Sequence, residues 1–489
     1  MKVNLISFYN RFAEYPTKYS LGTMKLGAYI GQDDNIEVKI IPIDSNSNIN
    51  EDIIKKLIND NPDIIGIPYY MWTEKIAKQI SAQIKEKNPN ILRIIGGPST
   101  PTVDFKDWNE DEIFIVGEGE IALNEICNKK RENPDFNSEK VLELGLKNVF
   151  SQNKDLEDKN ITYIDKDIPK GLSLFSEKVE KMKGDKELEE FAWYETNRGC
   201  AYNCGYCGHK TRNNLGYVDI EQVKEEIENM QRVGIKRLFV VDPIIGGNKK
   251  NGKEVLRLLN KSLPNAKIIA YLRPELLDDE FVNLLEEANL EEMRFGIQTL
   301  NPAVPAWIRS NSIKKINEEL SKLKGKNINW RAELIAGLPG DDYKGFRNSI
   351  KTVIDDFQPT VLAIYHLTAI KGTKLYNLVE KPTMDEWLKI DENSQAKSSH
   401  SYSEVEFRQM AEYATLITSM YNLLKLSFPK KTVDFTKLEK YILKNREEFD
   451  KKRLYEFDEK YVTQMWSKKL KGANHEKANT DETFSIPRE

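Results

Sequence analysis

The feature that most constrains this chain is a cluster of three of its four cysteines, Cys200, Cys204 and Cys207. Their spacing, Cys-x3-Cys-x2-Cys, supplies one thiolate fewer than a closed metal site needs. A structural zinc ion or an ordinary electron-transfer iron–sulfur cluster usually takes four protein ligands. Three thiolates on a four-iron cubane would leave one iron without a protein ligand. An open metal position is where chemistry can take place.

Spacing alone leaves a second interpretation equally open. His209 follows Cys207 by two residues and could complete a Cys3His zinc site. The fourth cysteine, Cys127, lies far upstream beside Ile126 in a helical pattern, which is typical of a small buried hydrophobic residue. The position of the triplet in the fold must therefore decide between a cluster and zinc.

The bulk properties limit the classes of protein to consider. The 489 residues are enough for two or three domains. A formal net charge of −4, with both signs interspersed, predicts no obligatory nucleic-acid partner. No signal peptide or apolar run of transmembrane length is present, so we expect no membrane association. Clustered thiols favour a reducing compartment, and the predicted localisation is cytoplasmic.

The first 135 residues alternate between short β-rich runs and helical segments, which predicts a doubly wound parallel sheet. Ligands of such sheets bind at the carboxyl ends of the strands. The expected strands cover 3–9, 37–43, 63–69, 91–95 and 113–116, and the expected helices cover 21–31, 49–59 and 73–86.

Aromatic residues and glycines follow three of these strands. Glycine lets the backbone lie close to a large ligand. The same sequence pattern would also arise if the glycines only form turns and the neighbouring glutamates only stabilise helix N-termini. No Gly-x-Gly-x-x-Gly follows the first strand, so a dinucleotide is disfavoured. The candidate ligand-binding residues are Tyr69, Tyr70, Met71, Trp72, Gly96, Gly97, Pro98, Gly117, Glu118 and Gly119.

This arrangement resembles the cobalamin-binding domain of B12 enzymes, in its radical-enzyme branch. The mutase type of that domain places a histidine on the lower face of cobalt through an Asp-x-His-x-x-Gly loop. The four histidines of this chain are His209, His366, His400 and His475, so none lies in the first domain. The resemblance therefore implies cobalamin without a protein histidine as lower axial ligand. That face would be empty, water-bound or approached by something near residues 69–72, and an axial ligand strongly tunes a metal.

Strand–helix alternation resumes at residue 191. Six such units predict a partial (β/α)6 barrel, whose active site lies at the carboxyl ends of the strands. The cysteine triplet follows the first of them. The expected strands cover 192–196, 237–242, 267–272, 293–298, 329–335 and 361–367, and the expected helices cover 220–232, 253–261, 279–288, 313–324 and 343–356.

With the triplet placed there, residues 190–375 resemble the radical S-adenosylmethionine (AdoMet) superfamily. Tyr206 matches the aromatic residue common between the last two cysteines. Three later segments match landmarks of the superfamily in the right order: residues 295–302, residues 333–341 (Glu-Leu-Ile-Ala-Gly-Leu-Pro-Gly-Asp) and residues 371–375 (Lys-Gly-Thr-Lys-Leu). The resemblance implies a [4Fe–4S] cluster held by Cys200, Cys204 and Cys207, with AdoMet on the fourth iron.

The resemblance also implies AdoMet-binding residues. Gln298 and Glu333 match positions that contact AdoMet, Glu333 through the ribose hydroxyls, although either could instead form a hydrogen bond at the barrel rim. Asp242 stands where the family often has Gly-Gly-Glu, a motif that this chain lacks. Arg309 lies one residue before the place of an AdoMet-binding arginine. Tyr206 completes the predicted AdoMet set.

The two domains in this order resemble the cobalamin-dependent, class B radical AdoMet methylases. The resemblance implies a C-methyltransferase: the cluster cleaves AdoMet, the resulting radical abstracts hydrogen from an unactivated substrate carbon, and methylcobalamin supplies the methyl group. It also implies a flavodoxin- or ferredoxin-type electron donor and a small-molecule or peptide substrate. One alternative is a B12 radical enzyme for ring contraction, cyclisation or rearrangement. Another is a zinc-stabilised binding module.

The predicted domain organisation has five parts. They are a cobalamin-binding domain (1–135), a linker or cap (136–188), a radical AdoMet core (189–376), a helical substrate-shaping region (377–470) and a disordered tail (471–489). Within the helical region the expected helices cover 384–390, 403–426 and 436–449.

Overall fold

The computed structural model describes residues 1–11, 13, 17–100, 107–152, 168–183, 190–211, 215–379 and 387–445. The chain divides into two compact units. The first contains residues 1–199, 212–241 and 261–266, and the second contains residues 200–211, 242–260 and 267–489. No helix among the described residues is long and apolar enough to cross a membrane.

The first unit contains a six-stranded sheet in the order β2-β1-β3-β4-β5-β6. The first five strands are parallel and β6 is antiparallel to β5. This confirms the expected parallel sheet, and each predicted strand lies within two residues of its predicted ends. The strands are β1 (Lys2–Tyr9), β2 (Glu37–Asp44), β3 (Ile64–Pro68), β4 (Leu92–Gly97), β5 (Ile113–Val116) and β6 (Val149–Phe150).

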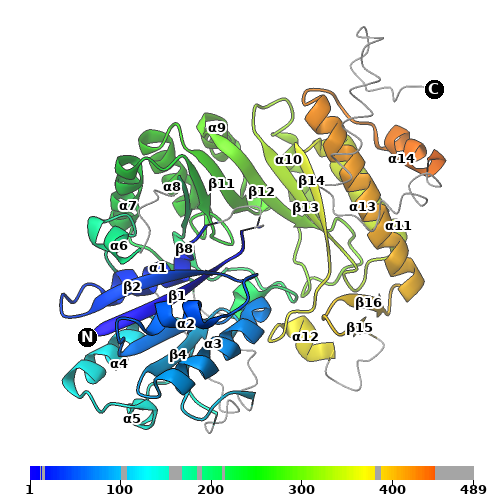
Figure 1. Cartoon of the computed structure of the whole chain (residues 1–489). Coiled ribbons are helices and arrows are strands. Elements are labelled where there is room, and N and C mark those ends of the chain that lie inside the picture. The colour runs from blue at the N-terminus through cyan, green and yellow to red at the C-terminus, as the bar shows by residue number, and fades with distance from the viewer. Residues whose placement is uncertain are drawn as a thin grey trace. The chain divides into compact units, whose positions relative to one another are not determined.

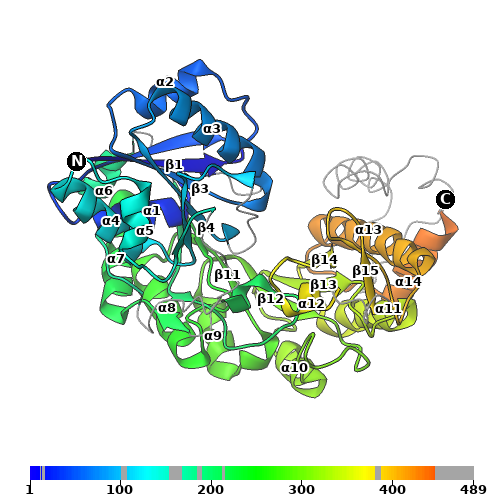
Figure 2. The same ribbon diagram turned by 90° about the horizontal axis from the view of Figure 1, so that it is seen from below.

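Helices cover both faces of this sheet (Figures 1 and 2). Because side chains alternate along a strand, β1 sends Ile6 and Phe8 into a core with α2 and α3, while Leu5 faces the opposite side. On that opposite side α1 lies against α4. The helices are α1 (Leu21–Ile30), α2 (Glu51–Ile58), α3 (Glu74–Lys87) and α4 (Glu120–Glu132). Cys127 in α4 is fully buried, as expected for a core residue.

Residues 136–188, expected as a linker or cap, contain regular structure in their described part. These elements are α5 (Ser138–Glu143), β6 and α6 (Glu177–Met182). Since β6 pairs with β5, this segment adds a strand to the first sheet. A two-residue antiparallel strand has too little alternation to be visible in a sequence.

Six further parallel strands alternate with helices along the chain, as the partial barrel requires. Strand β7 (Phe191–Tyr194) pairs with β10 (Arg237–Val240) in the first unit. In the second unit β11 (Lys267–Leu272), β12 (Leu290–Gln298), β13 (Trp330–Ala336) and β14 (Val361–His366) pair in that order. The helices are α7 (Ile220–Val233), α8 (Lys249–Ser262), α9 (Asp279–Glu287), α10 (Ile313–Ser321) and α11 (Tyr343–Thr352).

The region after the barrel is only partly helical. Helix α12 (Lys374–Val379) follows β14, and α13 (Glu404–Ser427) and α14 (Phe435–Lys444) were both expected. The predicted helix over 384–390 is wrong in its described part. Residues Leu388–Ile390 form β15, antiparallel to β16 (Ala396–Ser399), because a short apolar run pairs as readily in a hairpin as it packs in a helix. The predicted tail, 471–489, lies outside the described residues.

Candidate functional site

The three cysteines of the triplet lie in one loop. It begins after β8 (Asn197–Arg198) and ends at a 3-10 helix, Gly208–Thr211. Three backbone hydrogen bonds hold it: Cys207 N–H donates to Cys204 O at 3.1 Å, Gly205 N–H donates to Ile308 O at 3.1 Å, and Leu375 N–H donates to Gly205 O at 2.8 Å. Segments far apart in the sequence therefore fix the middle of the loop.

Two buried arginines face the central cysteine. Arg309 Nη1 donates to Cys204 Sγ at 3.4 Å, and Arg273 Nη1 lies 4.0 Å from the same sulfur. Both guanidinium groups and Cys204 are buried. Positive charge at this position would offset the negative charge of a metal–thiolate group bound there. The loop is therefore suited to an anionic metal–thiolate group.

The side chains of the loop are not arranged around a single point, as the ligands of a zinc ion would be. Across the described ranges, no three His, Cys, Asp or Glu side chains are grouped so as to hold one metal ion. His209, the fourth ligand of the zinc alternative, is exposed. A cubane places each thiolate on a different iron, so its cysteines need not converge on one point. Burial raises the pKa of Cys207 to about 11, and that proton leaves when a metal coordinates the sulfur.

Three of the predicted AdoMet-binding residues surround Gly296 on β12. Arg309 Nη2 donates to Gly296 O, and the side-chain amide of Gln298 lies so close that a Cβ at position 296 would be 2.6 Å from Gln298 Nε2. Glu333 on β13 is in register with Gly296. Arg309 thus links Cys204 to Gly296 on β12, beside which lie the Gln298 amide and, in register on β13, Glu333.

Gln298 has an unusual backbone at the end of β12. Its φ is +69°, in the left-handed region that non-glycine residues rarely adopt, and the register with β13 shifts between Gly296 and Gln298. Such conformations cost free energy and cluster at functional sites. The shift turns the Gln298 side chain over Gly296.

Glu333 is a buried carboxyl group in the barrel interior. The Tyr365 hydroxyl donates to its Oε1 at 3.4 Å, while the neighbouring Arg294 and Arg331 bind Glu292 at 2.6 and 2.8 Å. Burial raises the pKa of Glu333. Its carboxylate oxygens remain available as acceptors for ligand hydroxyl groups.

The other two predicted AdoMet residues have different surroundings. Tyr206 is half-buried in the cysteine loop. Asp242 is fully buried, and its Oδ2 accepts a hydrogen bond from Gly246 N–H at 2.9 Å, so it supports the turn after β10.

Arg273 and its partners were missed in the sequence. Arg273 follows the carboxyl end of β11, donates to Glu275 at 2.7 Å and to Ser310 O at 2.6 Å, and lies 3.8 Å from the centre of the Tyr202 ring. The signal available was a charged residue directly after a predicted barrel strand.

The cysteine loop depends on a glycine between its last two cysteines. A Cβ at Gly205 would lie 2.7 Å from Trp307 Cζ3 and 3.0 Å from Trp307 O, whereas at Gly208 it would meet nothing within 4 Å. We expect Gly205→Ala to shift the loop and lower the iron retained after anaerobic reconstitution several-fold. Gly208→Ala is the matched control and should retain wild-type iron. Equal iron content in both variants would contradict this role of Gly205.

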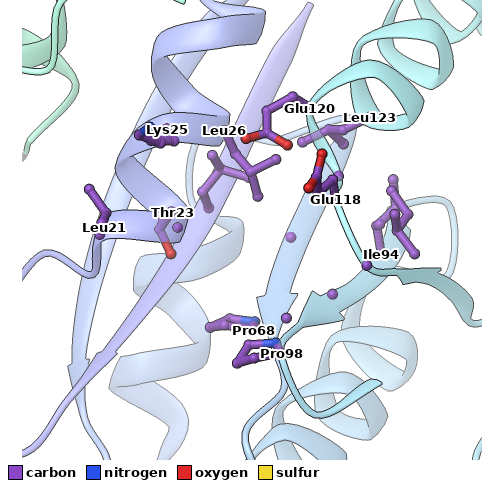
Figure 3. A pocket seen from close by; sticks show the side chains of 18 of the residues that line it. Leu21, Thr23, Lys25, Leu26, Pro68, Ile94, Pro98, Glu118, Glu120 and Leu123 are labelled. Atoms are coloured by element: carbon purple, nitrogen blue, oxygen red, sulfur yellow. The ribbon is translucent and has the colours of Figure 1, made fainter. Parts of the chain in front are cut away.

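The first unit contains a pocket of about 300 Å³ between the sheet and helices α1 and α4 (Figure 3). Seven of the ten candidate ligand-binding residues line it. They are Tyr70, Gly96, Gly97, Pro98, Gly117, Glu118 and Gly119. Its walls are mostly apolar, with Leu5, Leu26 and Ile94 among them.

Glycine is required at one strand end beside this pocket. Gly97 has φ +130°, and a Cβ there would lie 2.8 Å from Tyr69 O. Side chains at position 97 are therefore excluded both by backbone conformation and by space. Gly96 has neither restriction, since a Cβ there would meet only Ile115 O, at 3.8 Å.

The aromatic residues after β3 divide into two environments. Tyr69 is buried, donates to Glu74 at 3.0 Å and packs edge-on against Trp108. Trp72 is 71% exposed and stacks on Tyr70 with ring centres 4.9 Å apart. Neither Tyr69 nor Trp72 lines the pocket. Tyr70 does line it, so its stacking places the exposed Trp72 indole next to a pocket residue.

Several pocket residues were not visible in the sequence. Helix α1 contributes Leu21, Thr23, Lys25 and Leu26, whose side chains Figure 3 shows on one side of the pocket. Glu195 and Arg198, which flank the end of β7, also line it. Helical periodicity marks a buried face but not the empty space beside it.

Comparison with known proteins gives two domain matches. The B12 binding domain matches residues 18–127, and the radical SAM superfamily matches residues 194–353. These matches correspond to the two parts of the chain that contain the pocket and the cysteine loop.

Two curated relatives and one solved structure are similar over longer ranges. The cobalamin-dependent radical SAM methyltransferase TokK of Streptomyces tokunonensis is 25% identical over 65% of this chain and 49% of its own length. The 2-(S-pantetheinyl)-carbapenam-3-carboxylate methyltransferase of Streptantibioticus cattleyicolor is 24% identical over 66% of this chain and 49% of its own. The chain thus spans about half the length of both relatives.

The structural match supports the fold. The radical S-adenosylmethionine methyltransferase TsrM of Kitasatospora setae, solved with tryptophan substrate and a SAM analogue, has a TM-score of 0.61 and 16% identity. The match covers 79% of this chain and 77% of that one. The architecture of a B12-binding domain followed by a partial radical SAM barrel is therefore confirmed.

Proposed function

We propose that this protein, which carries a B12-binding domain followed by a radical SAM domain, is a cobalamin-dependent radical AdoMet C-methyltransferase. The single observation that supports the proposal is that one chain contains two sites. One is a three-cysteine loop with arginines beside Cys204, and the other is a glycine-edged pocket at the carboxyl ends of β3, β4 and β5.

The two domains imply three cofactors: a [4Fe–4S] cluster, AdoMet and cobalamin. Cys200, Cys204 and Cys207 would hold the cluster, and Tyr206, Asp242, Gln298, Arg309 and Glu333 are the residues proposed for AdoMet. Asp242 also supports the turn after β10. The 300 Å³ pocket is too small for a whole cobalamin. Its mostly apolar walls suit a heteroaromatic group such as the base at the end of the cobalamin tail.

When bound, the cluster with AdoMet supplies one-electron chemistry, and AdoMet with cobalamin supplies a transferable methyl group. The protein's own residues prepare the site. Arg309 and Arg273 place positive charge beside Cys204, where it would offset the negative charge of a metal–thiolate group. Gly296 leaves space for the Gln298 amide, and Glu333 offers acceptors for ribose hydroxyls. Burial of these groups keeps water away from reactive species.

The test compares two products made from AdoMet. Reconstituted protein, loaded with hydroxocobalamin and reduced anaerobically, is incubated with AdoMet. We expect both 5′-deoxyadenosine and S-adenosylhomocysteine, measured by liquid chromatography and mass spectrometry. The second product reports loss of the methyl group. Cobalamin-dependent S-adenosylhomocysteine supports methyl transfer, whereas 5′-deoxyadenosine alone would favour the rearrangement alternative.

The proposal extends to partners and setting. A flavodoxin- or ferredoxin-type protein supplies electrons to the cluster. The substrate is a small molecule or a peptide with an unactivated carbon. The free cysteines, Cys127 among them, fit a reducing, cytoplasmic environment.

Trp72 gives a prediction about the cobalt environment. The first domain offers no histidine, and the exposed Trp72 indole, stacked on Tyr70, would lie near the cobalt of bound cobalamin. We expect Trp72→Ala to change the visible and electron paramagnetic resonance spectra of bound, reduced cobalamin, because a group beside a metal ion tunes its electronic properties. The exposed Leu443→Ala is the control and should leave both spectra unchanged. Identical spectra for Trp72→Ala and wild type would rule out this placement.

A further inference from the structure

A group of five charged side chains lies on one wall of the pocket in the first unit. Arg198 is at its centre: Nη2 contacts Glu120 at 2.5 Å and Glu195 at 2.7 Å, and Nη1 lies 3.8 Å from Glu118. Lys25 on α1 binds the same Glu195 at 2.6 Å. All five residues line the pocket.

This charged group is enclosed, so its pairings are strong. The side chains of Arg198 and its three carboxylate partners are between 6% and 16% exposed. Burial alone raises the pKa of Glu195, but Lys25 and Arg198 outweigh it and hold the pKa at about 2. Charges taken out of water depend on their partners, so displacement of Arg198 would leave three enclosed carboxylates with Lys25 alone.

The three ion pairs of Arg198 differ in length. The contacts with Glu120 and Glu195 are at hydrogen-bond distance, whereas Glu118 is more than 1 Å farther away. Glu118 lies between Gly117 and Gly119, at the carboxyl end of β5, where a ligand of the sheet would be in contact. A ligand that removes water from this end strengthens the Arg198–Glu118 attraction. The Arg198–Glu118 contact is therefore the one that a ligand in the pocket would change most.

Arg198 also begins the cysteine loop. It is two residues before Cys200, and the backbone between them is fixed. Arg198 pairs with Gly216 in the short antiparallel β8–β9 (Gly216–Tyr217) ladder, and Asn197 Nδ2 donates to Gly199 O at 3.1 Å. Gly199 has φ +82°, so the turn into the loop needs glycine. A residue whose side chain lines the pocket is thus separated from a predicted cluster ligand by one residue, Gly199.

We propose that Arg198 is a positioning residue that couples occupancy of the cobalamin pocket to the stability of the cluster loop. This inference rests on the proposed cobalamin and cluster sites. Filling of the pocket tightens the Arg198–Glu118 contact and holds the start of the loop more firmly. Because linkage is reciprocal, cluster assembly in turn strengthens cobalamin binding by the same factor.

The experiment measures loss of iron from the reconstituted full chain in the presence of a chelator. The probe is hydroxocobalamin, added or omitted, and its binding is followed separately by visible absorption. For the wild type we expect hydroxocobalamin to slow iron loss about 5- to 10-fold, within the usual range for coupled sites. Arg198→Lys keeps the charge but loses the forked geometry, so we expect it to bind hydroxocobalamin more weakly by about the coupling that it loses. At hydroxocobalamin concentrations that saturate the variant, we expect the protection to fall to less than about 2-fold.

Two further variants make the result specific. Glu118→Gln removes only the negative charge of the longest ion pair of Arg198. This variant should fold normally, and hydroxocobalamin should slow its iron loss less than in the wild type. Arg131→Lys alters an arginine–carboxylate pair of this unit that does not line the pocket, Arg131 with Asp33, and hydroxocobalamin should slow its iron loss as much as in the wild type. Wild-type protection in Arg198→Lys, or no protection in the wild type despite bound hydroxocobalamin, would overturn the coupling. Failure of the wild type to bind hydroxocobalamin would overturn the proposed function and the coupling with it.

Discussion

Replacement of Cys204 by alanine is expected to remove nearly all cluster iron from the reconstituted protein. A [4Fe–4S] cluster would give about four iron atoms per chain, and we expect less than about one in the variant. Cys204 is the buried member of the triplet and the sulfur to which Arg309 donates at 3.4 Å. Its loss removes a ligand and leaves two enclosed guanidinium groups without that acceptor, a cost of about 1–3 kcal/mol.

Two further variants separate ligation from folding. Cys204→Ser retains an acceptor for Arg309 and should unfold at a higher temperature than Cys204→Ala while losing the cluster equally. Cys127→Ala is the matched control, because Cys127 is fully buried in α4 outside the loop. It should retain full iron and visible absorption, with a stability loss of about 1 kcal/mol from the small cavity. Iron retained in Cys204→Ala, or bound zinc in its place in the wild type, would contradict the cluster assignment.

The second large effect is expected from Gly96→Leu in the cobalamin pocket. Gly96 lines the pocket beside Ile94, and a Cβ there would meet only Ile115 O, at 3.8 Å. The Cβ of a leucine is therefore accommodated, and we expect the rest of the side chain to occupy the pocket. We expect the dissociation constant for hydroxocobalamin to rise at least about 100-fold, which equals about 2.8 kcal/mol.

Stability and binding should change in opposite directions in this series. Glycine weakens a strand by about 0.5–1 kcal/mol relative to alanine, so Gly96→Ala and Gly96→Leu should unfold at or above the wild-type temperature. Gly96→Ala should weaken hydroxocobalamin binding much less than Gly96→Leu, because it fills less of the pocket. Iron content should stay at the wild-type level in both. Wild-type affinity in Gly96→Leu would show that cobalamin does not use this pocket.

Most elements of both sheets could be predicted because their strands combine strong apolar patterns with short, polar connections. Helix α8 begins four residues before the predicted start, since Lys249 and its neighbours carry no apolar periodicity. The hairpin of β15 and β16 was missed because Leu388–Ile390 is too short to distinguish a strand from a helix. Such elements are defined by their pairing partners, which a local pattern does not contain.

The candidate sites were predictable to different degrees. Glycines and aromatic residues at strand ends identified seven residues of the pocket, because parallel strands bring their carboxyl ends to one edge. Trp72 and Tyr69 share that location in the sequence but not the same environment, since neighbouring side chains leave the backbone in different directions. The α1 wall of the pocket had no signal beyond ordinary helical periodicity.

The sequence by itself determined the three thiolates and the order of the two domains, because both are written in local spacing and strand–helix alternation. Only the tertiary structure decided what surrounds those thiolates. Arg273 and Arg309 reach Cys204 across 69 and 105 residues of chain, and Arg198 meets Glu120 across 78. Contacts of that separation depend on how the strands pair and on which face each side chain leaves. The charges beside the cysteine loop and the charges on the pocket wall therefore appear only when the chain is folded.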